Sequence, residues 1–82
     1  MKKHVKNYLA HHGLSGYEFI ACETCGGRSV EIHHIIPRSK FGSKRKDEQD
    51  APDNLIALCR ACHDRAHNGE YSIEYLKSKK NV

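Results

Sequence analysis

The sequence contains little of what builds a large apolar core. It has no tryptophan, one methionine and two phenylalanines, and hydrophobic residues fill only 38% of its 82 positions. Domains of this length bury too little apolar surface to be comfortably stable, so they usually carry a metal or disulfides. The sequence therefore predicts a single domain over residues 1–82 whose fold depends on such cross-links.

A long hydrophobic run is also missing. No apolar stretch follows the basic start of the chain, Met1-Lys2-Lys3, as a secretory signal would require. No segment approaches the roughly 20 apolar residues that span a membrane. We therefore expect a cytoplasmic chain with no membrane partner, and thiols in that compartment stay reduced.

The four cysteines form two Cys-x-x-Cys pairs, Cys22 with Cys25 and Cys59 with Cys62. This spacing favours one tetrahedral structural zinc over the alternative of disulfides, because zinc ligands commonly come in such pairs. The 33 residues between Cys25 and Cys59 exceed the interval of an isolated zinc ribbon. Another structural unit is therefore inserted between the two pairs.

The formal net charge of the chain is +4. A basic domain of this size favours a polyanionic partner, most simply nucleic acid. Many ordinary lysine-rich surfaces carry the same charge, so this signal is weak unless specific residues support it.

Residue patterns predict three helices and two strands. Gly13 and Gly69 stand where helices would end, Ser72 can cap a helix, and Pro37 can end a strand. The expected elements are a helix over residues 3–12, a strand over 29–36, a strand over 55–58, a helix over 59–68 and a helix over 73–80.

Residues 38–53 read as a long polar loop, with basic residues first and acidic residues after them. Long loops without structure of their own are often functional, although a solvated, mobile excursion has the same composition. The sequence leaves both interpretations open.

Four histidines form two pairs. His63 and His67 are four residues apart, so on a helix they share one face and lie about 6 Å apart along its axis. This arrangement offers two imidazoles to one metal, but no glutamate follows His63, so the metalloprotease motif is incomplete. His33 and His34 are consecutive on the expected strand and should point to opposite faces. One of them is available as a ligand and the other for a different role, and strand geometry does not say which.

Three segments together resemble the HNH nuclease family, whose active site is the ββα-metal fold. They are Glu31-Ile-His-His-Ile-Ile-Pro37, then Asp53-Asn54-Leu55, then Cys62-His63 through His67. The flanking Cys-x-x-Cys pairs are similar to those of zinc-stapled members, including restriction-type and phage-encoded ones. The resemblance covers residues 22–67. It implies a small α+β fold, with a ββα-metal (His-Me finger) core, a four-cysteine zinc and flanking N- and C-terminal helices.

The resemblance also implies a role for each matching residue. His33 stands at a metal-ligand position and His34 at the general-base position. His63 and His67 match the family members in which the helix gives two ligands. Asn54 stands where relatives have the asparagine that orders the loop and holds the base in place.

These residue types suit phosphodiester hydrolysis. A neutral His34, with an unperturbed pKa near ~6.5, can take a proton from a nucleophilic water. A divalent ion on His33, His63 and His67 would act as a Lewis acid at the phosphate. One such ion suffices, because no carboxylate cluster is present for a second; Mg²⁺, Mn²⁺, Ni²⁺ and Zn²⁺ are the candidates.

The expected partner is double-stranded DNA, recognised with loose sequence preference. Basic residues provide backbone contacts, which give affinity but little sequence information. A chain this small leaves little surface for reading bases, so a protein partner would supply specificity. A bacterial or phage-encoded origin follows by resemblance. The candidate contacts are Arg38, Lys40, Lys44, Arg45, Lys46, Arg60 and Arg65.

Two other functions compete with the endonuclease. A zinc-stapled nucleic-acid-binding module without catalysis explains the charge and the cysteines, but it does not need the four matching histidines. A protein-interaction zinc domain, with His33 or His63 in place of a thiol, is disfavoured because the thiols already complete a four-ligand site.

Overall fold

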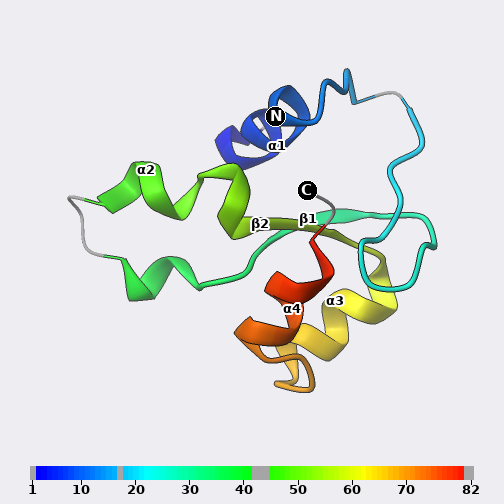
Figure 1. Ribbon diagram of the computed structural model, residues 1–82, viewed down its shortest axis with the longest axis vertical. Coiled ribbons are helices and arrows are strands. Elements are labelled where there is room, and N and C mark those ends of the chain that lie inside the picture. The colour runs from blue at the N-terminus through cyan, green and yellow to red at the C-terminus, as the bar shows by residue number, and fades with distance from the viewer. Residues whose placement is uncertain (1, 17, 42–44, 81–82) are drawn as a thin grey trace.

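Two short antiparallel strands lie at the centre of the computed structural model, which describes residues 2–16, 18–41 and 45–80. Figure 1 shows helix α1 on one side of this hairpin and helices α3 and α4 on the other, while α2 and its neighbouring turns extend sideways. The elements in order are α1 (Lys3–His11), β1 (Glu31–His34), η1 (Arg38–Lys40), α2 (Lys46–Gln49), η3 (Pro52–Asn54), β2 (Leu55–Leu58), α3 (Arg60–His67) and α4 (Ile73–Lys79). This is the small α+β, ββα-metal fold that the sequence predicted.

Strand β2 is buried on both faces, which explains its unbroken apolar run. Its four residues are 0% exposed. Ile56 and Leu58 pack in a cluster with Cys62 and with Leu76 of α4. Leu55 and Ala57 instead pack in a second cluster with Tyr8 of α1. The strand therefore joins two small cores, and neither core is complete without it.

The strand register decides which way the paired histidines point. In the antiparallel pairing, His33 is opposite Ile56 and His34 is opposite Leu55. Residues that pair across strands face the same side of a sheet. His33 therefore faces α3, and His34 faces α1, as the alternation of side chains along a strand predicts.

The predicted helices and strands are confirmed, with small shifts at their ends. The Ser72 hydroxyl accepts a hydrogen bond from the Tyr75 N–H at 3.0 Å and caps α4. Gly69 has a φ of +79°, a conformation open to glycine, just after α3 ends. Strand β1 is shorter than expected, although the Val30 N–H to Leu58 and Ile35 N–H to Asn54 bonds extend the pairing at each end.

The prediction of a long polar loop over residues 38–53 was wrong for the residues of this segment that the structure describes. This segment contains η1, α2 and the start of η3, and its residue Asp50 is only 6% exposed. The Asn7 amide donates to the Asp50 carbonyl at 3.0 Å, so α1 holds the segment against the body of the protein. The polar composition here marks short helical turns around buried polar contacts, which a count of charged residues does not reveal.

Among the described residues, no helix is long and apolar enough to cross a membrane.

Candidate active site and metal centres

The four cysteine thiols converge at the junction between the turn after Ala21 and the start of α3. Their sulfur atoms all lie within 4.8 Å of one another, and the Sγ atoms of Cys25 and Cys59 are 3.6 Å apart. Ligand sulfurs of a tetrahedral zinc lie roughly 3.8 Å apart, given Zn–S bonds of about 2.3 Å. The spacing fits a zinc ion and is far too long for a disulfide of about 2.05 Å.

The pKa values of the clustered thiols also favour a bound cation. Burial raises the pKa of Cys22, but hydrogen bonds from the Thr24 hydroxyl and from backbone N–H groups outweigh it and lower the pKa to about 6. The Gly27 N–H lowers the pKa of Cys25, but hydrogen bonds shared with the other three thiols raise it to about 12. Four thiolates at this spacing repel one another, and a bound cation such as zinc would offset that repulsion.

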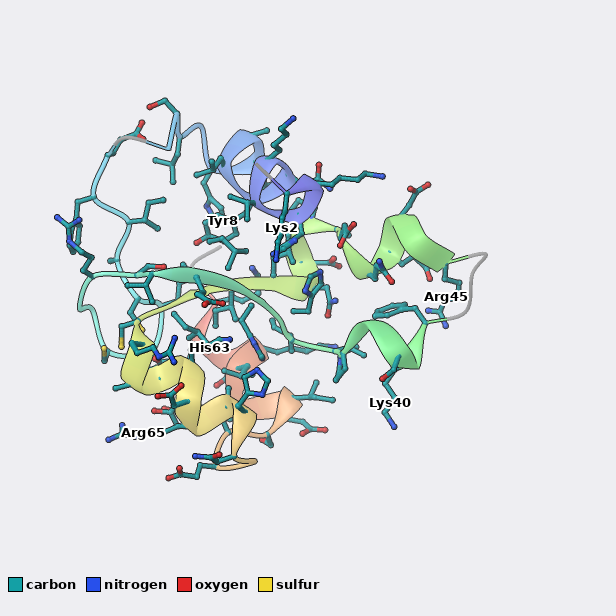
Figure 2. All side chains as sticks on the ribbon, turned by 180° about the vertical axis from the view of Figure 1, so that it is seen from behind. Lys2, Tyr8, Lys40, Arg45, His63 and Arg65 are labelled. Atoms are coloured by element: carbon teal, nitrogen blue, oxygen red, sulfur yellow. The ribbon has the colours of Figure 1, made fainter. Side chains whose placement is uncertain are left out.

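The three histidines predicted as ligands of a catalytic metal lie together between β1 and α3. The ring centroids of His63 and His67 are 4.8 Å apart. The ring centroid of His33 lies 5.4 Å from that of His63 and 6.3 Å from that of His67. Figure 2 shows His63 lying between α3 and the sheet, whereas Arg65 projects from the outer side of α3. The structure thus gathers this trio, although its nitrogens are spread more widely than the thiols.

The surroundings of the trio suit metal binding. Burial, together with the nearby rings of His63 and His67, lowers the pKa of His33 to about 4, so this imidazole is neutral at physiological pH. In the described part of the chain, the buried Nδ1 atom of His63 has no hydrogen-bond partner. Its other nitrogen, Nε2, lies 3.5 Å from Oε2 of Glu31. A carboxylate beside one ring nitrogen and no hydrogen-bond partner at the other is a common setting of a metal-ligating histidine.

His34, the predicted general base, lies on the α1 side of the sheet. Its Nε2 atom is 2.8 Å from Oδ1 of Asp50, and the two side chains are 14% and 9% exposed. The ring of His4 packs on the His34 ring with centroids 4.4 Å apart. Both His4 and Asp50 were missed from the sequence, because nothing in their local pattern links them to His34.

Asn54 joins the segment after β1 to the segment before β2. Its side-chain oxygen accepts a hydrogen bond from the Ile36 N–H at 2.8 Å. Its amide nitrogen donates to the carbonyl oxygens of Ile36 at 3.2 Å and Gln49 at 2.9 Å. Asn54 is 5% exposed, so these three backbone groups depend on it in place of water.

One cleft of about 670 Å³ connects the trio of His33, His63 and His67 with His34. His33, His34, His63 and His67 all line it. His4 lines it as well, and so do two lysines from distant parts of the chain, Lys2 and Lys40. Lys2 was not among the predicted nucleic-acid contacts, since its proximity to the cleft depends on how α1 packs.

The structure describes the side chains of four of the seven predicted basic contacts, and three of these four have other partners. Arg45 forms an ion pair with Glu48 and lies over the Phe41 ring. The Arg60 Nε atom lies 3.5 Å from Oδ1 of Asp64, and Arg65 donates to the Tyr71 hydroxyl at 3.4 Å. Lys40 is exposed at the edge of the cleft. Lys44 lies outside the described residues, as do the side chains of Arg38 and Lys46.

A two-stranded hairpin followed by a helix, with histidines from the first strand and the helix facing each other, defines a protein of the ββα-metal class. The model of the HNH endonuclease family matches residues 22–69, and the chain belongs to this family. That match covers β1, β2, α3 and all four cysteines.

Three curated proteins illustrate its relatives. The type IV methyl-directed restriction enzyme EcoKMcrA of Escherichia coli is 32% identical over 66 residues, which cover 68% of this chain and 22% of the enzyme. Anaredoxin of Nostoc sp. is 34% identical over 73 residues, which cover 89% of this chain and 79% of that protein. The putative COX1/OXI3 intron 2 protein of Saccharomyces cerevisiae is 28% identical over 72 residues, or 8% of its length. The chain therefore spans less than a quarter of the length of EcoKMcrA. No solved structure gives a significant match.

Proposed function

We propose that this chain is a metal-dependent endonuclease that hydrolyses phosphodiester bonds in double-stranded DNA, and that residues 1–82 act as a single nuclease domain. The observation that carries the proposal is the shared cleft, which is lined both by the trio of His33, His63 and His67 and by His34. A hydrolytic site needs a ligand set and a separate base at one place, and this cleft has candidates for both.

The trio would hold the catalytic divalent ion. His33 is neutral, and the unpartnered Nδ1 of His63 is free to bind. Glu31 would orient His63 by accepting from its Nε2–H. When bound there, the ion provides Lewis-acid stabilisation of the charge on the phosphate oxygens. The four cysteines would hold the structural zinc.

His34 would take the proton from the attacking water. A neutral imidazole carries one N–H, and a carboxylate accepts but does not donate a hydrogen bond. Because Asp50 faces Nε2 at 2.8 Å, the proton resides on Nε2, and the lone pair remains on Nδ1. Asp50 thus selects the tautomer in which Nδ1 is the base.

Asn54 and the lysines would position the reacting groups. By binding both backbone groups of Ile36, Asn54 fixes the chain just after His34. Lys2 and Lys40 line the cleft and would contact DNA phosphates on either side of it. Such contacts carry little sequence information, so we expect loose specificity in the isolated chain and a protein partner where specificity is needed.

The named relatives support a nucleic-acid substrate. EcoKMcrA is a restriction enzyme by name, and the yeast protein is named for an intron. These names describe the full-length relatives. The region that they share with this chain is the HNH endonuclease domain.

Cleavage of supercoiled plasmid by the purified, zinc-loaded chain tests the proposal. The assay compares the wild type, His34→Ala and a matched control, His11→Ala, at an exposed histidine of α1. Each protein is assayed with Mg²⁺, Mn²⁺, Ni²⁺, Zn²⁺ or EDTA. We expect nicked or linear product with a divalent ion, lost at least 100-fold in His34→Ala and retained in His11→Ala.

Two results would contradict the proposal. Cleavage by His34→Ala at the wild-type rate would show that His34 is not the base. If no metal supports cleavage while the wild type still retards DNA in a gel, the chain is the zinc-stapled binding module that its positive charge also permits.

A further inference from the structure

A second group of metal-ligating side chains lies on the opposite face of β1 from the trio. His4, His34 and Asp50 each offer a ligand atom, and these atoms all lie within 4.8 Å of one another. The three side chains come from α1, β1 and the segment that follows α2. His4 and Asp50 are 7% and 6% exposed, so the group is built into the fold and is not a chance meeting of surface residues.

We propose that His4, His34 and Asp50 form a second transition-metal site, selective for zinc-like ions, and that its occupation switches off His34 as a base. Two imidazoles and one carboxylate are a ligand set that zinc uses in sites with one open position. The set carries one negative charge, and its nitrogen donors favour zinc or cobalt over magnesium. Magnesium or manganese could then support cleavage in the trio while leaving this group empty.

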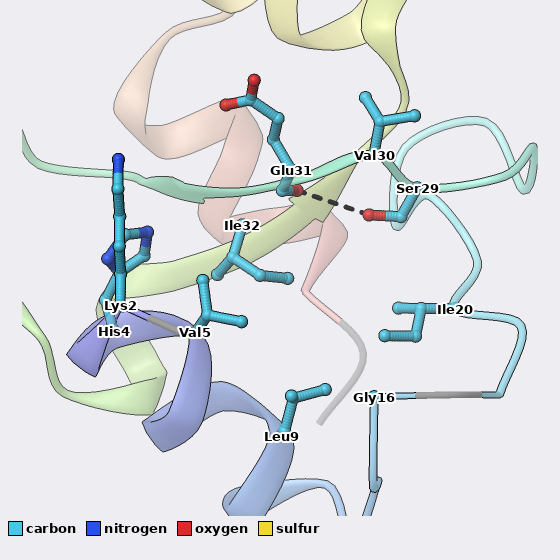
Figure 3. A pocket seen from close by; sticks show the side chains of 10 residues that line it. All are labelled: Lys2, His4, Val5, Leu9, Gly16, Ile20, Ser29, Val30, Glu31 and Ile32. Carbon is cyan, nitrogen blue, oxygen red and sulfur yellow. Dashed lines mark hydrogen bonds between the residues drawn. The ribbon is translucent and has the colours of Figure 1, made fainter.

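The site is accessible from the cleft. His4 and His34 both line the cleft of about 670 Å³, and the open position would face it. Figure 3 shows His4 at the start of α1, on the side of the helix that faces β1. In a tetrahedral zinc site with Zn–N bonds of about 2.0 Å, ligand atoms are roughly 3.3 Å apart. The His34 and Asp50 atoms, now 2.8 Å apart, need to separate only slightly to admit an ion.

The inhibitory effect follows from the chemistry of imidazole. Nε2 of His34 faces Asp50, so Nε2 is the atom that would bind the ion. Binding uses the Nε2 lone pair, and the single N–H of the neutral ring must then be on Nδ1. A protonated Nδ1 cannot accept a proton from water. This consequence rests on the proposed role of His34 as the base, whereas the binding of the ion does not.

A cobalt titration tests binding separately from activity. The zinc-loaded chain carrying His63→Ala and His67→Ala, in which the trio is disabled, is titrated with Co²⁺ and followed by visible absorption and calorimetry. We expect one additional Co²⁺ per chain. Adding His4→Phe keeps a ring against His34 but removes a ligand, and should weaken binding at least tenfold. Adding Asp50→Asn, which keeps the shape of the side chain, should do the same.

The matched control is His11→Phe in the same background, since His11 is an exposed histidine of the same helix. Circular dichroism and zinc content confirm that each variant is folded. If His4→Phe and Asp50→Asn bind Co²⁺ as tightly as the His11→Phe control does, the site does not exist and the three side chains form only a hydrogen-bonded group.

Zinc inhibition of cleavage tests the consequence. Cleavage supported by Mg²⁺ or Mn²⁺ is measured against added Zn²⁺, and each variant is normalised to its own rate without added Zn²⁺. We expect micromolar Zn²⁺ to inhibit the wild type and His11→Phe, and the inhibition midpoint to rise at least tenfold in His4→Phe. An unchanged midpoint would place the inhibition at the trio and overturn the switch. If no metal supports cleavage at all, the nuclease proposal fails, while the cobalt titration still decides the site.

Discussion

The hydroxyl of Tyr8 donates a 2.8 Å hydrogen bond to Oε2 of Glu23, and the same carboxylate oxygen accepts the Ala57 N–H at 2.8 Å. Glu23 lies between Cys22 and Cys25, so this contact connects α1, the first cysteine pair and β2. Tyr8 is 3% exposed. One partly buried carboxylate thus links the cysteine cluster to the helix that carries His4.

Tyr8→Phe should therefore destabilise the protein by about 1.5–3 kcal/mol, the usual contribution of a hydrogen bond to a charged group. Guanidinium unfolding of the zinc-loaded protein measures this change. Tyr75→Phe is the matched control, since Tyr75 is 37% exposed and should change stability by less than about 0.5 kcal/mol. Equal effects of the two substitutions would mean that the Tyr8 hydroxyl contributes nothing specific.

The same contact predicts a loss of stability at high pH. Burial, together with the hydrogen bond and charge of Glu23, raises the pKa of Tyr8 above its ordinary value of 10.0. Above pH 10 the unfolded chain loses the Tyr8 proton while the folded protein keeps it, so stability falls as the pH rises. Unfolding midpoints measured from pH 8 to 11 should fall more steeply for the wild type than for Tyr8→Phe. Parallel curves would contradict the raised pKa.

Asn54→Ala should lower both the stability of the protein and its rate of cleavage. It leaves the Ile36 N–H and two carbonyl groups without their partner, at about 1–3 kcal/mol for each buried group that water does not reach. Asn54→Asp keeps the acceptor oxygen but cannot donate to the two carbonyls, so it should also be destabilised. Thermal unfolding measures stability, and plasmid cleavage at a temperature where each variant remains folded measures the positioning of His34. Wild-type cleavage by folded Asn54→Ala would show that this positioning is not needed.

Lys2 and Lys40 should contribute to DNA binding through phosphates. Binding is measured in a His34→Ala background at several salt concentrations, so that no cleavage occurs. Each lysine changed to glutamine should reduce the slope of log affinity against log salt by about 0.9 if it contacts one phosphate. Lys6→Gln, at an exposed position of α1, is the control and should leave the slope unchanged. Equal slopes for all three variants would show that the DNA binds to another surface of the protein.

Loss of the zinc ligands should unfold the domain. Cys62 is 2% exposed and belongs to the core cluster beneath α3, so Cys62→Ser removes a ligand and leaves a hydroxyl in an apolar setting. A structural zinc contributes folding free energy directly. We expect the zinc content to fall below one ion per chain, with loss of the helical circular dichroism signal. Cys59→Ser should behave alike, and a folded, zinc-free Cys62→Ser variant would contradict this role.

Local spacing was enough to predict much of this protein. The Cys-x-x-Cys pairs are short-range patterns, and the sulfur cluster follows once the two turns meet. The helical spacing of His63 and His67 sets their shared face, and strand alternation separates His33 from His34 whatever surrounds them. The run of apolar residues in β2 marked a strand buried on both sides. Each of these features depends on backbone periodicity, which a single segment carries by itself.

The partners of His34 were decided only by tertiary packing. His4 and Asp50 reach it because α1 packs over β1, and because Asn7 of α1 binds the Asp50 carbonyl. The position of Lys2 at the cleft depends on the same packing. Such contacts join segments far apart in sequence, and they form only where burial of Tyr8, Leu55 and Ala57 holds the elements together.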